Sequence, residues 1–148
     1  MALEVLEQQY RTPELLLLGI RENGFTIARM LGDYLATDYQ GNLQVGSIVM
    51  DKRHPADIRM EPPIPLEGKV VILIDDVANS GRTMLYALKA LLDEYPVAIQ
   101  TLALVERTHK SFPVALDYVG LSLSTTPDQH IYVEVAADEI TGAWMDEE

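Results

Sequence analysis

The sequence predicts an α/β fold with a twisted, mainly parallel sheet flanked by helices. Residues 15–18 and 70–74 are continuous apolar runs, which are typical of strands buried on both faces of a parallel sheet. The second run is rich in β-branched side chains, so we expect it at the centre of the sheet. Between these runs and after them, apolar residues recur at the helical period. Strands and helices therefore alternate along the chain.

Two helices are predicted from the spacing of apolar residues. Residues 27, 30, 31 and 35 form one stripe, and Thr26 is placed to cap the helix that carries them. Residues 84, 85, 88, 91 and 92 form a second stripe after a polar segment. Each helix thus follows one of the two apolar runs.

The remaining segments predict further strands and one irregular region. Residues 43–50 indicate a strand with a break around Gly46, and residues 99–105 and 118–121 indicate two more. Ile131, Val133 and Val135 alternate as in an edge strand. Residues 51–68 contain four prolines and are expected to resist regular pairing.

Composition limits the classes of function. The chain has 148 residues, with 11 Lys and Arg against 23 Asp and Glu, so its net charge is −12. We expect one domain over residues 1–148, and a field that disfavours RNA or DNA. The absence of cysteine, of an apolar membrane segment and of a basic leader indicates a soluble, cytoplasmic protein. The acidic residues 146–148 are interpreted as a solvated tail.

Residues 75–83 carry the most informative chemistry. Asp75 and Asp76 end a buried strand, and carboxylates there can accept hydrogen bonds from ribose hydroxyls directly or through Mg²⁺. The residues that follow offer backbone N–H groups at a helix N-terminus, which is a phosphate-binding arrangement. Gly81 allows a ligand to approach the backbone closely. The segment therefore predicts a site for a ribose 5-phosphate, with an acidic turn and a serine cap as the alternative.

Residues 72–83 resemble the phosphoribosyl-diphosphate motif of the type I phosphoribosyltransferases. Residues 102–109, 112–113 and 117–120 are similar to the PyrR family of pyrimidine-operon regulators and uracil phosphoribosyltransferases, and residues 19–24 resemble the pyrophosphate loop of that family. The resemblance covers nearly the whole chain. It implies the type I phosphoribosyltransferase fold with a short flexible hood around Lys52, Arg53 and His54.

By position, the resemblance implies roles for individual residues. Asp75 and Asp76 would bind ribose and Mg²⁺, and Arg21 and Arg53 would act with them in catalysis by holding the departing pyrophosphate. The other implied substrate-binding residues are Glu22 and Asn23 in the pyrophosphate loop, Ala78, Asn79, Ser80, Gly81, Arg82 and Thr83 in the phosphate loop, and Arg107, Tyr118 and Val119 in the base pocket.

The implied reaction transfers ribose 5-phosphate from phosphoribosyl diphosphate to a nucleobase, uracil being the expected base, with release of pyrophosphate. Asn79 stands where 6-oxopurine enzymes place an aspartate base, which argues against purines because an amide cannot accept that proton. The family also implies a homodimer or larger assembly. The residues before Tyr10 are expected to lack the family's opening helix.

Two alternatives remain from the sequence. Glu22 and Asn23 replace a neutral and a basic residue of the family pattern, so the chain could be a catalytically weak nucleotide-binding protein. The second alternative is an RNA-binding regulator, which needs a basic surface, and the chain has only 11 Lys and Arg residues to form one.

Overall fold

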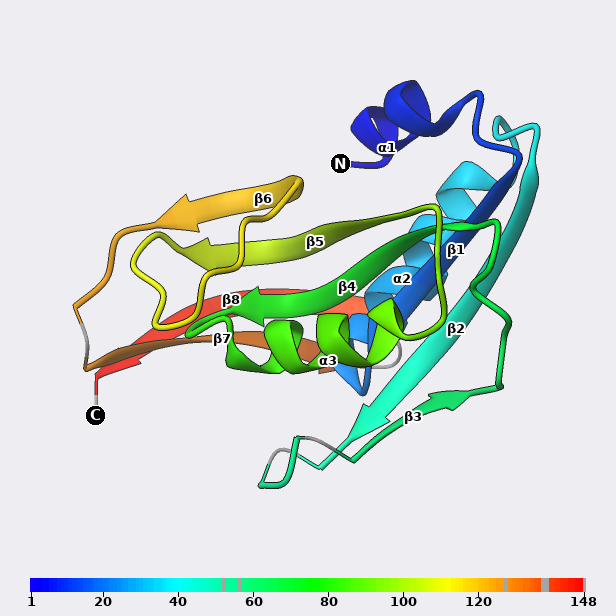
Figure 1. The fold of residues 1–148 in the computed structure, drawn as a ribbon. Coiled ribbons are helices and arrows are strands. Elements are labelled where there is room, and N and C mark those ends of the chain that lie inside the picture. Colours follow the sequence, from blue (N-terminus) through cyan, green and yellow to red (C-terminus); the bar gives the residue numbers. More distant parts are fainter. Residues whose placement is uncertain (52, 56, 127, 137–138, 148) are drawn as a thin grey trace.

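The two apolar runs of the sequence become neighbouring parallel strands in the computed structural model of the chain (Figure 1). The structure describes residues 1–51, 53–55, 57–126, 128–136 and 139–147. The elements in chain order are α1 (Ala2–Gln9), β1 (Glu14–Ile20), α2 (Asn23–Leu35), β2 (Asn42–Met50), β3 (Ile58–Glu61), β4 (Val70–Ala78), α3 (Arg82–Leu92), β5 (Ala98–Arg107), β6 (Tyr118–Leu123), β7 (Gln129–Ala136) and β8 (Glu139–Glu147).

The main sheet has the strand order β3-β2-β1-β4-β5-β6, and β3 is its antiparallel member. β1 lies between β2 and β4, so both β1 and β4 are internal strands, as their continuous apolar sequences predict. The carboxyl ends of β1 and β4 lie side by side, because Gly19 pairs with Ile74. The loops that follow these two strands therefore meet at one edge of the sheet.

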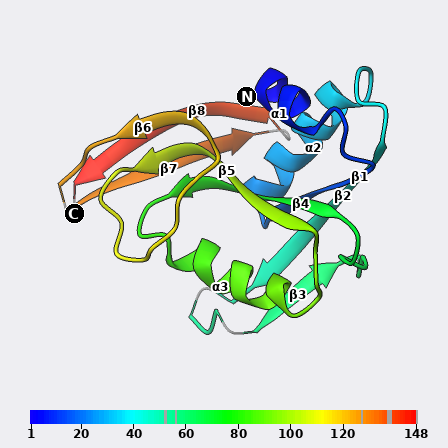
Figure 2. The same ribbon diagram turned by 45° about the horizontal axis from the view of Figure 1, so that its top comes forward.

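Helices cover both faces of the sheet (Figure 2). α1 and α2 pack on one face, where Leu15, Leu17 and Ile72 belong to the same core cluster as Leu31 and Leu35 of α2. α3 covers the other face through Met84, Ala87 and Leu91. The alternation of side chains along β1 and β4 thus supplies both hydrophobic layers.

The region before Tyr10 differs from its expectation, because it forms the helix α1. Val5 is fully buried and joins the core cluster under α2, so this short helix is held by packing. The prediction that Thr26 caps α2 is also wrong. The helix begins earlier, at Asn23, with Glu22 at the N-cap position, and the N–H of Thr26 bonds the carbonyl of Glu22 at 3.3 Å.

Strands extend further than the sequence predicts. β2 runs through Gly46 without a break, and β4 continues to Ala78, so Asp75 and Asp76 lie within the strand. The extension of β4 follows from its pairing with β5, where Asp75 is opposite Ala103 and Ala78 is opposite Glu106. Strand pairing in the sheet thus overrides the local preference of acidic residues for turns.

The proline-rich region 51–68 contains β3, a strand that the sequence analysis missed. β3 pairs with β2 through Ser47 and Glu61 at one end and Met50 and Ile58 at the other. The expected hood therefore includes the turn that joins β2 to β3. Lys52 lies outside the described residues, whereas Arg53 is exposed and its N–H bonds the Oδ1 of Asp51 at 2.9 Å.

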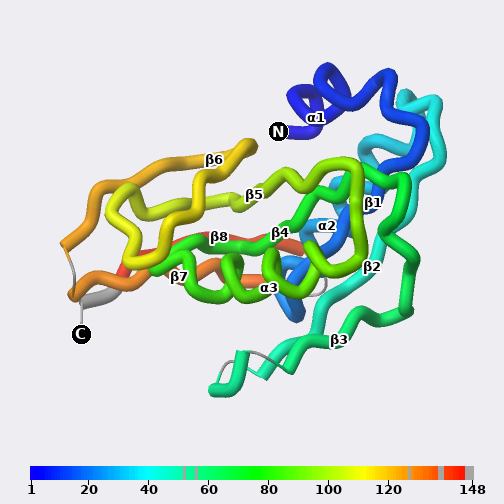
Figure 3. Tube along the Cα trace, in the orientation of Figure 1, coloured from blue at the N-terminus to red at the C-terminus, as the bar shows by residue number. Residues whose placement is uncertain are grey.

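The C-terminal segment folds back as an antiparallel hairpin of β7 and β8 (Figure 3). The alternating residues Ile131 and Val133 are buried against Val77 of β4 and Val105 of β5. The predicted strand is therefore present, but it belongs to a second small sheet. The acidic end, which is expected as a tail, belongs to the hairpin up to Glu147, which is paired with Gln129. Within the described residues, no helix is long and apolar enough to span a membrane.

Candidate active site

A polar pocket of about 340 Å³ lies where the loops after β1 and β4 meet the β7–β8 hairpin. The sequence and its family resemblance predict one site that contains Asn23, Asp75, Asp76 and residues 78–83, and all of these residues line this pocket. The remaining lining residues are Ile20, Val77, Met84, Ile131, Tyr132 and Val133. The pocket thus joins segments from three distant parts of the chain.

The acidic pair forms one wall of the pocket. Asp75 and Asp76 are half-buried, and each accepts a hydrogen bond from the following backbone N–H: Asp76 N to Asp75 Oδ1 at 2.9 Å, and Val77 N to Asp76 Oδ1 at 2.7 Å. Asp76 Oδ2 accepts a further bond from Asn23 Nδ2 at 2.9 Å. These bonds fix the orientation of the carboxylates, because each carboxylate has one oxygen held by the backbone.

The opposite wall is the loop that leads into α3. Gly81 is the N-cap residue, with a φ of 82° that favours glycine, and α3 directs its first N–H groups to the pocket. Ser80 Oγ accepts a bond from the N–H of Arg82 at 3.2 Å. The carbonyl of Ser80 accepts bonds from the N–H groups of Ser111 and Phe112 at 3.1 and 3.0 Å. The segment after β5 therefore supports this loop from outside the pocket.

In the loop after β1, the side chain of Arg21 is bonded to other parts of the protein. The Arg21–Glu22 peptide is cis, and Arg21 Nε donates to Ser47 Oγ at 3.0 Å. Arg21 Nη2 also forms an ion pair with Glu61 Oε2 at 3.4 Å. Arg21 and Glu22 line a neighbouring depression with Arg29, and Asn23 lines both that depression and the main pocket.

Close packing fixes the start of α2 against β4. A Cβ atom built on Gly24 would lie 2.5 Å from the carbonyl oxygen of Ile74. Only glycine allows the first turn of α2 to approach the end of β4 so closely. This contact holds the loop after β1 next to the acidic pair.

Besides Arg21 and Glu22, four predicted site residues lie away from the pocket lining: Arg53, Arg107, Tyr118 and Val119. Arg53 is exposed at the β2–β3 turn, and Val119 lies on β6. Arg107 is buried and donates to Thr125 Oγ1 at 2.6 Å and to the carbonyl of Thr126 at 2.9 Å. It therefore anchors the segment that leads to β7.

Tyr118 lies in the core and not in a base pocket, where the resemblance implies it. Its side chain is fully buried in the core, and its hydroxyl donates to Gln100 Oε1 at 2.7 Å. Burial raises the pKa of this hydroxyl, with charges of Asp117 and Glu4 adding to the effect and the hydrogen bond from Gln9 opposing it. The physical reason for its place is that β6 turns this large side chain toward α1.

β7 is the part of the site that sequence reasoning missed. The carbonyl of Ile131 accepts a bond from Asn79 Nδ2 at 3.3 Å, and the N–H of Ile131 donates to Asn79 Oδ1 at 3.4 Å. Tyr132 stacks on Trp144 across the hairpin, with ring centroids 5.7 Å apart. The alternation of Ile131, Val133 and Val135 signals a buried face, but it does not say what that face packs against.

A larger groove of about 920 Å³ lies along α3 and the start of β5. Its lining is mostly apolar and includes Leu92, Tyr95 and Val97, which are exposed, and Lys89 is its one charged residue. It lacks the convergent polar groups that hold a polar ligand. The smaller pocket is therefore the candidate active site.

The chain matches the family of phosphoribosyl transferase domains over residues 1–140. It is 36% identical to the bifunctional protein PyrR of Streptomyces coelicolor, covering 92% of this chain and 76% of that protein. PyrR of Ligilactobacillus salivarius is 32% identical, covering 96% and 85%.

Solved structures show the same fold at low sequence identity. The hypoxanthine phosphoribosyltransferase of Trypanosoma cruzi matches with a TM-score of 0.72 at 16% identity, covering 83% of this chain and 73% of that one. A hypoxanthine-guanine phosphoribosyltransferase of Bacillus anthracis matches with a TM-score of 0.68 at 16% identity, covering 88% and 74%. The type I phosphoribosyltransferase fold expected from the sequence is thus confirmed, and the chain belongs to the phosphoribosyltransferase family.

Proposed function

We propose that the protein transfers the ribose 5-phosphate group of phosphoribosyl diphosphate to uracil and releases pyrophosphate. The observation that carries this proposal is the pocket itself, whose walls are an acidic pair and the N-terminus of α3. The two walls suit the two ends of a ribose 5-phosphate. Uracil is supported as the base by the relatives named PyrR, because the PyrR family that the sequence resembles consists of pyrimidine-operon regulators and uracil phosphoribosyltransferases.

The 5-phosphate binds at the loop before α3. The N–H groups at the start of α3, together with the hydroxyls of Ser80 and Thr83, donate to phosphate oxygens, and the helix dipole favours the anion. Asp75 and Asp76 accept hydrogen bonds from the ribose hydroxyls. Since both walls are held by backbone hydrogen bonds, the substrate meets groups that are already oriented.

The residues present fit a Mg²⁺ ion that arrives with the substrate. Asp75 and Asp76 are two carboxylates on the pocket wall, and Mg²⁺ is commonly bound by one or two carboxylates together with substrate phosphates. Among the described residues, no cluster of three or more His, Asp or Glu side chains is placed to hold a metal alone. When bound, Mg²⁺ stabilises the negative charge that develops on the leaving pyrophosphate.

Pyrophosphate leaves toward the loop after β1. The N–H groups at the start of α2 and the guanidinium of Arg21 receive it, and closure of the β2–β3 turn brings Arg53 over it. Uracil attacks ribose C1 through a ring nitrogen from the side of β7. The bond from C1 to the pyrophosphate oxygen breaks as the bond from C1 to nitrogen forms, and the ring proton passes to solvent.

A second candidate function is a nucleotide-binding protein with weak catalysis, and the ion pair between Arg21 and Glu61 favours it. A guanidinium held by a carboxylate is less available to pyrophosphate. We also propose a homodimer or larger assembly, as the family resemblance implies. RNA regulation is the weakest candidate, since the net charge is −12.

The test is Mg²⁺-dependent release of pyrophosphate from phosphoribosyl diphosphate with uracil as the acceptor. The Asp75→Asn/Asp76→Asn variant is the control. Release that requires uracil and is lost in this variant supports the transferase and its base together. Binding of phosphoribosyl diphosphate without release on uracil or any other base would instead support the nucleotide-binding protein.

A further inference from the structure

We propose that Asn23 is a positioning residue, which couples the loop after β1 to the acidic pair and to the β7–β8 hairpin. The family resemblance implies that Asn23 contacts pyrophosphate. The structure instead directs its amide to two protein acceptors. For its ligand-binding part, the inference rests on the proposed function.

Both acceptors of the amide are part of the pocket wall. Asn23 Nδ2 donates to Asp76 Oδ2 at 2.9 Å and to the carbonyl oxygen of Val133 at 3.1 Å. A side-chain NH₂ group has two hydrogens, so both donors of this amide are used. The donor that pyrophosphate would need is therefore already bonded.

The two bonds join segments that are distant in sequence. Asp76 is 53 residues and Val133 is 110 residues from Asn23. Asn23 is the first residue of α2, and the neighbouring Gly24 packs closely on β4. A shift of the loop after β1 is therefore transmitted to the carboxylate of Asp76 and to β7.

β7 has a second attachment of the same kind. Asn79 exchanges hydrogen bonds with the backbone of Ile131, at 3.3 and 3.4 Å. Ile131 and Val133 bury their side chains against Val77 and Val105. Asn79 holds the hairpin from the phosphate loop, whereas Asn23 holds both the hairpin and Asp76, which distinguishes the two amides.

The first experiment measures backbone hydrogen exchange in the ligand-free protein, in a peptide that covers residues 129–136. Asn23→Ala should speed exchange there by about threefold to tenfold, because one hydrogen bond to the hairpin is lost. Asn23→Asp keeps the shape of the side chain but places a carboxylate beside Asp76, and should speed exchange at least as much. A peptide from α3 should be unchanged, which shows that the variants are folded.

The chain offers a matched control at the other end of the sheet. Asn42 Nδ2 donates to Glu14 Oε2 at 2.8 Å, so it also joins an amide to a carboxylate, but at an exposed position away from the pocket. Asn42→Ala should leave exchange in residues 129–136 within about twofold of the native value. Unchanged exchange of β7 in both Asn23 variants would overturn the inference.

The second experiment separates positioning from direct contact with pyrophosphate. Calorimetry measures the affinity for inorganic pyrophosphate, which probes the loop after β1, and the affinity for uridine 5′-monophosphate, which probes the acidic pair and the phosphate loop. A positioning role predicts that Asn23→Ala lowers the affinity for the nucleotide by about tenfold and the affinity for pyrophosphate by less than about twofold. A lower affinity for pyrophosphate with an unchanged affinity for the nucleotide would overturn the inference. If the native protein binds neither ligand, the proposed function fails, and the exchange experiment still decides the inference.

Discussion

The two loops that frame the pocket follow the neighbouring strands β1 and β4 and lead into α2 and α3, on opposite faces of the sheet, yet they present different groups to it. The loop before α3 is held from behind, by bonds from Ser111 and Phe112 to the carbonyl of Ser80. The loop before α2 is held through its own side chains, since Arg21 is bonded to Ser47 and Glu61. The phosphate loop is thus held from outside the pocket that it lines, whereas Arg21 of the loop after β1 is bonded to protein groups outside that pocket.

Under the proposed function, this difference predicts how the two ends of the substrate bind. The phosphate end would meet a preformed cradle of backbone N–H groups, which needs little rearrangement. The pyrophosphate end would meet a loop whose arginine must exchange a protein carboxylate for the ligand. We therefore expect changes in the two loops to affect different steps of binding.

The largest expected effect comes from the acidic wall that both loops share. Asp75→Asn/Asp76→Asn should lower kcat/KM by about 100-fold or more, since each carboxylate provides a charge-assisted hydrogen bond. Steady-state release of pyrophosphate measures it. Asp33→Asn, on the exposed side of α2, is the control and should leave kcat/KM unchanged. A loss of less than about tenfold in the double variant would place the ribose elsewhere.

The next effect tests the preformed cradle. Gly81→Ala should weaken binding of the 5-phosphate by about tenfold, since alanine is strained at a φ of 82° and its Cβ would lie 3.2 Å from the carbonyl oxygen of Phe112. Titration with ribose 5-phosphate measures the affinity.

A second glycine separates strain from contact in that experiment. Gly68 has a φ of 79°, but no atom lies within 4 Å of the position of a Cβ, and the residue is outside the pocket. Gly68→Ala should lower the free energy of unfolding by about 1 kcal/mol, a loss that the positive φ also predicts for Gly81→Ala, without changing phosphate affinity. Equal loss of affinity in both variants would mean that the cradle is not specific to the loop before α3.

The two loops also differ in how much of each could be predicted from the sequence. The segment of residues 75–83 is local, so its strand, loop and helix could be predicted from consecutive residues, although β5 pairing extends the strand to Ala78. The partners of Arg21 and Asn23 lie on β2, β3, β4 and β7, and no local pattern encodes such distant pairs. Resemblance predicts Tyr118 in a base pocket, whereas packing against α1 places it in the core.

A smaller effect is expected in the loop after β1, where Arg21 forms an ion pair with Glu61. Glu61→Gln removes the ion pair with Arg21, so KM for phosphoribosyl diphosphate should fall by about threefold at low salt, because an exposed pair contributes little. Glu61 also pairs with Arg59, at 3.3 Å. Arg59→Gln removes that second pair and leaves Arg21 bound, so KM should not fall. An unchanged KM in Glu61→Gln would show that Arg21 does not reach pyrophosphate.

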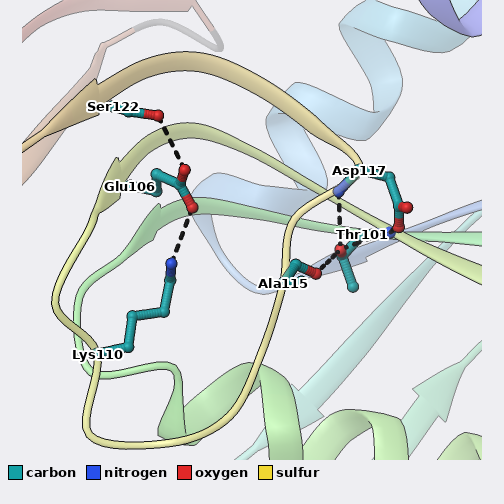
Figure 4. A network of polar contacts seen from close by, with 6 residues as sticks. All are labelled: Thr101, Glu106, Lys110, Ala115, Asp117 and Ser122. Carbon is teal, nitrogen blue, oxygen red and sulfur yellow. Dashed lines mark hydrogen bonds and ion pairs between the residues drawn. The ribbon is translucent and has the colours of Figure 1, made fainter.

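The smallest effect concerns the support behind the phosphate loop (Figure 4). Lys110 Nζ donates to Glu106 Oε2 at 2.8 Å, and Ser122 Oγ donates to Glu106 Oε1 at 2.8 Å. Burial raises the pKa of the Glu106 carboxyl, but these two hydrogen bonds and the charge of Lys110 together outweigh it. The pKa therefore lies below its ordinary value of 4.5.

A carboxyl whose pKa is lower in the folded protein adds stability that is present above its unfolded pKa and is lost as pH falls through the folded pKa. Glu106→Gln should therefore lower the free energy of unfolding by about 1 kcal/mol at pH 7, and the difference from the native protein should shrink below about pH 4. Urea unfolding at several pH values measures this, with Glu67→Gln, an exposed residue before β4, as the control. Since Lys110 also packs beside Gly81, phosphate affinity should fall slightly at pH 7 in Glu106→Gln. A difference in stability that persists at low pH would mean that the carboxylate charge does not hold this support in place.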